Sequence, residues 1–154
     1  MANQIRPILL VEDDANDVEL VLAALSAGNL ANPVLVARDG VEALATLRAH
    51  TYEGEHANGP VVMLLDNKMP RMSGLEVLER VKGDEQLKHI PIVMMTSSRA
   101  EPDLERAYAL GVNAYVVKPV DFKEFTDAVK VVGRFWAILN ELPPAGATRA
   151  RGAS

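Results

Sequence analysis

The chain has 154 residues, of which 49% are hydrophobic and 24% charged, with a formal net charge of −5 and no cysteine. This length and composition indicate one globular domain, and the lack of cysteine excludes disulfide scaffolds, thiol nucleophiles and thiolate metal sites. No apolar run reaches the roughly 18 residues of a membrane span, and residues 1–7 lack the apolar core of a secretory signal, so we expect a cytoplasmic protein. The excess of acidic residues argues against direct DNA binding.

Five short apolar runs recur along the chain, each bounded by polar or turn residues. The runs are continuous rather than alternating and rich in Val and Ile, which favours strands buried on both faces over segments of buried helix. We expect strands at Ile8–Val11, Val34–Ala37, Val61–Leu65, Ile92–Met95 and Ala114–Val117.

Apolar residues three and four positions apart follow every run, as in helices with one buried face. This spacing predicts helices around Val18–Leu25, Val41–Leu47, Leu75–Val81, Leu104–Leu110 and Phe122–Leu142. Strand and helix therefore alternate along the whole chain, which predicts an α/β fold of the flavodoxin-like type. We expect a doubly wound (βα)5 parallel sheet in the strand order 2-1-3-4-5, with helices on both faces.

One domain is expected to occupy residues 5–142. Residues 51–60 form a polar segment longer than most connections, so we expect an exposed insertion before the third strand. Residues 143–154 contain no large apolar side chain, and we expect a disordered tail there.

Polar side chains stand where the predicted strands end. Glu12 and Asp13 follow the first strand, Asp66 follows the third, Thr96 follows the fourth and Lys118 follows the fifth. In a doubly wound sheet the ligand crevice lies beyond the carboxyl ends of the strands. We therefore expect the three acids, the hydroxyl and the lysine to converge on one pocket.

Each polar residue also has an ordinary structural interpretation. An acid after a strand is more often a helix cap or a solvated turn residue, and Asp14 and Asp17 fit that interpretation in the first turn of the first helix. Asp39 is followed by glycine and fits turn chemistry. Thr96 could cap a helix and Lys118 could lie at the surface. These interpretations do not explain why the polar set gathers at the ends of the strands.

The acids suggest a site for a hard cation. Glu12, Asp13 and Asp66 cannot all stay ionised within a few ångströms of one another without a positive charge nearby. Oxygen ligands without any sulfur ligand favour Mg²⁺ or Mn²⁺. With such a cation present, a phosphate can approach a carboxylate, and the carboxylate can act as nucleophile to form an acyl phosphate.

Four motifs carry a family resemblance. The segments ILLVEDD at 8–14, LLDNKMPRMSG at 64–74, VMMTSS at 93–98 and AYVVKPVD at 114–121 resemble the receiver domain of bacterial two-component response regulators. The resemblance extends from residue 5 to about residue 142, and four motifs in the family order are far more specific than any one of them.

The resemblance implies a phosphoacceptor and a metal site. Asp66 matches the aspartate that accepts the phosphoryl group. Asp13 and Asp66 match direct ligands of Mg²⁺ (or Mn²⁺), while Glu12 matches an acid that acts through water. The backbone carbonyl of Lys68 would complete the protein ligands.

The resemblance also implies a set of switching and structural residues. Thr96 matches the hydroxyl that moves toward the phosphoryl group, Lys118 matches the lysine that pairs with that group, and Tyr115 occupies the aromatic switch position. Pro119 is expected to follow a cis peptide bond. Gly74 is expected to permit the turn of the loop after Asp66.

The implied function is that of a stand-alone response regulator, not of an ordinary enzyme. A histidine kinase would transfer a phosphoryl group to Asp66, and we expect output through protein contacts of helix four, strand five and helix five because no output domain follows. An aspartate-nucleophile phosphatase would share such a site, but those enzymes usually place a second acid where this chain has Lys68. A phosphorylation-independent interaction module is the other alternative.

The last predicted helix carries a second apolar stripe that one sheet does not need. Phe135, Ile138 and Leu142 belong to this stripe, and they predict a homodimer through the face of helix four, strand five and helix five. The ending GRFWAILNELPP and the 51–60 segment resemble single-domain receivers associated with phytochromes. That narrower resemblance implies a histidine kinase partner of the bacteriophytochrome kind.

Overall fold

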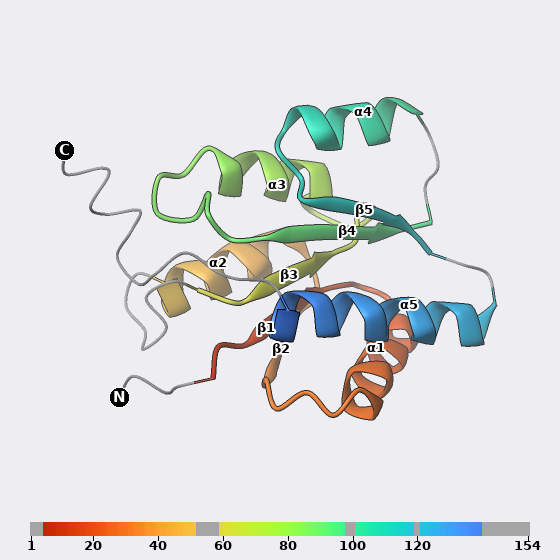
Figure 1. The fold of residues 1–154 in the computed structure, drawn as a ribbon. Coiled ribbons are helices and arrows are strands. Elements are labelled where there is room, and N and C mark those ends of the chain that lie inside the picture. Colours follow the sequence, from red (N-terminus) through yellow and green to blue (C-terminus); the bar gives the residue numbers. More distant parts are fainter. Residues whose placement is uncertain (1–4, 52–58, 98–100, 119–120, 140–154) are drawn as a thin grey trace.

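The computed structural model describes residues 5–51, 59–97, 101–118 and 121–139. Five parallel strands form one sheet in the order β2-β1-β3-β4-β5, which confirms the predicted flavodoxin-like topology (Figure 1). The strands are β1 (Ile8–Val11), β2 (Val34–Ala37), β3 (Val62–Leu65), β4 (Ile92–Thr96) and β5 (Ala114–Val117). Two bounds differ from prediction by one residue, since β3 begins at Val62 and β4 extends to Thr96.

Helices follow the strands in the predicted alternation. They are α1 (Ala15–Ala27), α2 (Gly40–Thr51), α3 (Gly74–Lys82), α4 (Glu101–Ala109) and α5 (Phe122–Arg134), followed by the π-helical segment η1 (Phe135–Leu139). The predicted fifth helix thus changes its winding after Arg134, which apolar spacing does not indicate. Residues 140–142, the tail at 143–154 and most of the 51–60 segment lie outside the described residues, and the proposed domain limits stay predictions.

Two apolar cores form because the central strands bury both faces. Alternate residues of β1 point to opposite sides, so that Leu9 joins one core and Leu10 the other. Helices α2, α3 and α4 cover the first core, and α1 and α5 cover the second (Figure 1). The helices α1 and α5 lie in close contact, because a Cβ added to Gly133 would come within 2.6 Å of Leu25 Cδ2.

The edge strands differ from the central ones. All residues of β1, β3 and β4 are buried, whereas those of β5 are half-buried. This explains why the central runs are the most continuously apolar in the sequence. No helix within the described ranges has the length and apolar character needed to cross a membrane.

Candidate phosphoryl-acceptor and metal site

The register of β1 and β3 places two acids side by side. Val11 pairs with Leu65, and the backbone N–H of Asp66 donates to the carbonyl of Val11 at 3.0 Å. Glu12 and Asp66 follow these paired residues directly, and both are buried, with 3% and 8% of their surfaces exposed. The carboxyl ends of two neighbouring strands therefore bring together two carboxylates that are 54 positions apart in the sequence.

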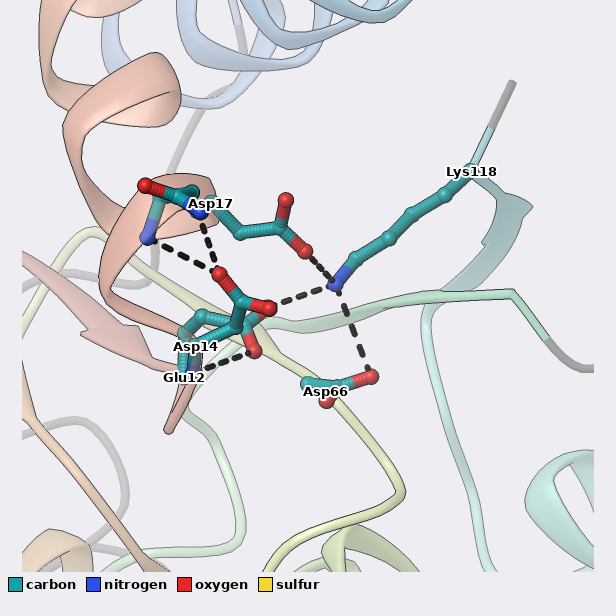
Figure 2. Close-up of polar contacts among 6 residues, drawn as sticks. Glu12, Asp14, Asp17, Asp66 and Lys118 are labelled. Carbon is teal, nitrogen blue, oxygen red and sulfur yellow. Dashed lines mark hydrogen bonds and ion pairs between the residues drawn. The ribbon is translucent and has the colours of Figure 1, made fainter. Parts of the chain in front are cut away.

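Lys118 reaches the same pocket from the end of β5. Its backbone N–H donates to the carbonyl of Thr96 at 2.8 Å, which continues the pairing of β4 with β5. Its ammonium Nζ lies 2.6 Å from Glu12 Oε1, 2.8 Å from Asp17 Oδ2 and 3.8 Å from Asp66 Oδ1 (Figure 2). One cation therefore faces three carboxylates.

Asp17 is the site residue that sequence reasoning missed. The sequence places it with Asp14 in the first helical turn, and Asp14 is indeed the N-cap of α1, accepting from the N–H groups of Asn16 and Asp17. Because this cap fixes Asp17 at the third helical position, its side chain can reach Lys118 at the strand ends. The available signal was the second acid one helical turn after Asp13.

A cluster of three acids fits a divalent cation. Glu12, Asp13 and Asp66 each offer a carboxylate oxygen, and these oxygens lie within 4.8 Å of one another. Two of these acids are buried and Asp13 is exposed, so the cluster opens to solvent on one side. Hard oxygen ligands in this number suit Mg²⁺ or Mn²⁺, which keep several water ligands beside one or two carboxylates.

The proton affinities of the pocket indicate a deficit of positive charge. Burial raises the pKa of Glu12 to about 7, although the hydrogen bond from Lys118 opposes this shift. Burial also raises the pKa of Asp66 against the charge of Lys118. Burial lowers the pKa of Lys118, but its hydrogen bonds to Asp17 and Glu12 outweigh burial, and the pKa is raised. Within the described part of the chain the ammonium of Lys118 therefore does not fully compensate the buried acids, and a metal ion would supply further positive charge.

The loop after Asp66 is held by the start of α3. Gly74 N–H donates to the carbonyl of Asn67 at 2.8 Å, and Leu75 N–H donates to Asn67 Oδ1 at 3.1 Å. A Cβ on Gly74 would lie 2.3 Å from the carbonyl oxygen of Asp66. Gly74 is therefore required by close approach rather than by a turn conformation, since the positive φ in this loop belongs to Arg71 (φ 66°).

The far end of the same loop is tied to α2. Arg71 forms an ion pair with Asp39, and Asp39 also accepts from the N–H of Glu42 at 2.8 Å. The hydrogen bond from Glu42 and the charge of Arg71 lower the pKa of Asp39. Sequence reasoning assigned Asp39 to a turn, and the structure adds that it anchors the loop that follows Asp66.

The comparison with known families decides what this arrangement is. The model of the response regulator receiver domain matches residues 8–130. The chain belongs to the response regulator receiver domain family.

This receiver domain is similar to proteins that are themselves named as response regulators. It is 36% identical over 146 residues to response regulator Rcp1 of Synechocystis sp. (strain ATCC 27184 / PCC 6803 / Kazusa), covering 94% of this chain and 97% of Rcp1. The crystal structure of Mn²⁺-bound Rcp1 matches with a TM-score of 0.80 over 90% of this chain and 99% of that one, at 36% identity.

Two further solved structures extend the comparison. The phosphorylated cyanobacterial phytochrome response regulator RcpA is 38% identical, with a TM-score of 0.82 over 91% of this chain and 99% of that one. The bacteriophytochrome response regulator AtBRR is 56% identical, with a TM-score of 0.68 over 90% of this chain and 99% of that one.

The remaining predicted residues of the receiver domain lie in different surroundings. Thr96 is fully buried at the end of β4, and Tyr115 is half-buried on β5, where it pairs in register with Met94 and packs against the core under α2, α3 and α4. Lys68 is exposed in the loop after Asp66. Pro119, with its expected cis peptide bond, lies outside the described residues.

The predicted dimer face is visible in part. Phe135 and Ile138 in η1 are 46% and 57% exposed, and Val131 in α5 is 68% exposed. Phe135 packs edge-on against Trp136 with ring centroids 5.0 Å apart. Leu142 lies outside the described residues. An apolar stripe is thus exposed on this side of the receiver domain.

Proposed function

We propose that this receiver domain accepts a phosphoryl group on Asp66 from the phosphohistidine of a histidine kinase. The observation that carries the proposal is the buried Asp66 carboxylate, which shares one pocket with Glu12, Asp13 and the ammonium of Lys118. A carboxylate oxygen of Asp66 attacks phosphorus, the P–N bond to histidine breaks, and the electron pair leaves with the imidazole. The product is an acyl phosphate.

The metal site belongs to this proposal. Mg²⁺ or Mn²⁺ held by Asp13, Asp66 and the backbone carbonyl of Lys68, with Glu12 acting through water, would neutralise charge on the transferring group. The three acids support this assignment by their spacing and by their donor type. Lys118, whose ammonium lies 3.8 Å from Asp66 Oδ1, would provide the second positive charge.

The output is proposed to follow from a local charge event. Phosphorylation adds roughly −1.5 to −2 of charge at Asp66. Thr96 and Lys118 would turn toward the phosphoryl group, and Tyr115 would move inward beside Thr96. The surface of α4, β5 and α5 would change with them, in the manner of a two-state switch.

Phosphorylation is tested with a small phosphodonor. Incubation with Mg²⁺ and acetyl phosphate is expected to add one phosphoryl group by mass spectrometry, and Asp66→Asn is expected to abolish it. The matched control is Asp14→Asn, because asparagine still caps α1. A wild-type chain that gains no phosphoryl group would overturn the proposal, and transfer that depends on Mg²⁺ or Mn²⁺ would support the metal assignment.

The kinase partner is proposed from the relatives. RcpA and AtBRR are named as phytochrome response regulators, and this chain shares 38% and 56% identity with them. We therefore expect a bacteriophytochrome histidine kinase to phosphorylate this chain faster than an unrelated histidine kinase does. Equal transfer rates from both kinases would remove the phytochrome assignment and leave the phosphoacceptor function intact.

A homodimer is proposed through the exposed apolar stripe of α5 and η1. Val131, Phe135 and Ile138 are spaced four and three positions apart and are all exposed. Gel filtration at micromolar concentration is expected to show a dimer, and Phe135→Ser with Ile138→Ser is expected to yield a monomer. Val41→Ser, at an exposed apolar residue of α2, is the control. A wild-type monomer with and without acetyl phosphate would contradict the dimer.

A further inference from the structure

The ammonium of Lys118 lies on the α1 side of the pocket. It is 2.8 Å from Asp17 Oδ2 but 3.8 Å from Asp66 Oδ1, so it makes a hydrogen-bonded pair with Asp17 and not with Asp66 (Figure 2). The function proposed above requires Lys118 to pair with a phosphoryl group on Asp66. The two arrangements compete for one ammonium, although its three N–H donors allow shared intermediates.

We propose that Asp17 is a positioning residue that holds Lys118 away from Asp66 until phosphorylation. Transfer of a phosphoryl group to Asp66 then draws Lys118 across the pocket and leaves the Asp17 carboxylate unpaired on the first turn of α1. This inference rests on the proposed function and deepens it. It assigns to α1 a change of charge that accompanies phosphorylation.

Exposure decides which carboxylate gives up the lysine. The side chain of Asp17 is 30% exposed, whereas that of Glu12 is 4% exposed. Breaking a buried pair leaves an uncompensated charge and is costly, while a partly exposed carboxylate regains water. Asp17 also lies in the first helical turn, where the helix dipole favours a negative charge. Asp17 is therefore the partner that releases Lys118 most easily.

The lysine can make this movement without rearranging the sheet. Its backbone is fixed by the hydrogen bond to Thr96, but its side chain is a flexible four-carbon stem. A small cavity at the strand ends is lined by the polar residues Glu12, Asp66 and Lys118 and by the apolar residues Leu10 and Met95. The ammonium of Lys118 lies 2.8 Å from Asp17 and 3.8 Å from Asp66. This difference is small enough for rotation of the lysine side chain to exchange one carboxylate for the other.

The test uses beryllium fluoride, a phosphoryl mimic, at saturating Mg²⁺. Asp17→Asn is expected to bind it about five-fold more tightly than wild type, the size of one partly exposed ion pair. Without the mimic, the same variant is expected to bind Mg²⁺ more weakly, because Lys118 moves toward Glu12 and Asp66. Isothermal titration calorimetry measures both affinities. If Asp17 had only a structural role, its substitution would not strengthen the binding of beryllium fluoride while weakening the binding of Mg²⁺.

Two matched variants separate position from charge. Asp14→Asn removes the same charge from the same helical turn, keeps the cap, and touches no lysine; both of its affinities are expected to stay within about two-fold of wild type. Asp17→Glu restores the carboxylate and is expected to return both affinities toward wild type. Asp17→Ser serves as a second charge-removing variant if Asp17→Asn does not fold.

The outcomes distinguish this inference from the function on which it rests. Wild type that binds the mimic while Asp17→Asn and Asp14→Asn behave alike would overturn the role of Asp17 only. Wild type that binds no mimic and gains no phosphoryl group at Asp66 would overturn the proposed function, and the inference with it. Tighter binding of the mimic and weaker binding of Mg²⁺ in Asp17→Asn alone would support both.

Discussion

Two partly buried lysines lie at opposite ends of the strands and contact different kinds of group. Lys82, at the end of α3, donates to the carbonyls of Lys88 and Ile90 and to Asn113 Oδ1, at distances between 3.0 and 3.2 Å. Lys118, at the carboxyl ends of the strands, faces three carboxylates instead. The acceptors of Lys82 are neutral, and those of Lys118 are charged.

This difference sets the proton affinity of each lysine and what each can do. Burial lowers the pKa of Lys82, because neutral carbonyls only partly replace the lost water. The carboxylates raise the pKa of Lys118 despite burial. Lys82 therefore ties together the segments that lead into β4 and β5, whereas Lys118 stays charged and can exchange one anionic partner for another. A buried lysine is functional here through its choice of acceptors, not through its burial.

The largest effect is expected from Lys118→Met, which keeps an apolar stem but removes the ammonium. Affinity for beryllium fluoride at saturating Mg²⁺ is expected to fall at least about ten-fold, because a charge-assisted contact to the phosphoryl mimic is lost. Titration calorimetry measures the change. Lys123→Met, at an exposed lysine of α5, is the control. An unchanged affinity for beryllium fluoride in Lys118→Met would show that Lys118 does not contact the phosphoryl mimic.

A smaller, purely structural effect is expected from Lys82→Met. Its three acceptors lose their donor, and the free energy of unfolding is expected to fall by about 1–3 kcal/mol. Urea denaturation followed by circular dichroism measures this change, and Lys88→Met, at an exposed lysine, is the control. Phosphorylation of Asp66 by acetyl phosphate is expected to stay at the wild-type level. If Lys82→Met lost phosphorylation without losing stability, Lys82 would have a functional role and not a structural one.

A further effect is expected from pH in the absence of divalent cations. The pKa of Glu12 is raised to about 7 from an ordinary value of 4.5, so the folded chain binds more protons than the unfolded chain between these values. The stability contribution of this group is therefore lost as pH rises from about 4.5 to about 7. The effect is limited to one proton, and the raised pKa already includes the opposing hydrogen bond from Lys118.

Glu12→Gln isolates that contribution. The difference in unfolding free energy between wild type and the variant is expected to depend on pH within this window, and urea denaturation at several pH values measures it. Added Mg²⁺ is expected to restore wild-type stability near pH 7, because the cation compensates the ionised acids. A difference that does not vary with pH would show that folding does not raise the pKa of Glu12.

The fold was predictable because its signals are local and repeated. Each buried strand appears in the sequence as a continuous apolar run, and each helix follows with its own spacing. The polar residues Glu12, Asp66 and Lys118 were predictable as one pocket because the topology places strand ends together. The change of winding after Arg134 was not predictable, because apolar spacing alone does not separate an α-helix from a short π-helical segment.

The residues that escaped prediction depend on contacts between distant segments. Asp14 and Asp17 look alike in the sequence, and only the contact with Lys118, 101 positions away, separates the cap from the ion pair. Asp39 looks like a turn residue, and its partner Arg71 is 32 positions away. The sequence predicts that Gly74 permits a turn, whereas the structure shows that glycine is needed because a Cβ would collide with the backbone of Asp66. This close approach becomes apparent only in the folded chain.

The loop that follows Asp66 is fastened at two points, by Asn67 to the first turn of α3 and by Arg71 to Asp39 at the start of α2. The pocket therefore has unequal sides. Among the residues that the structure describes, one side is braced against two helices, and on the other side the side chain of Lys118 approaches Asp66. We therefore expect a bulky group on Asp66 to displace Lys118 more readily than the braced loop.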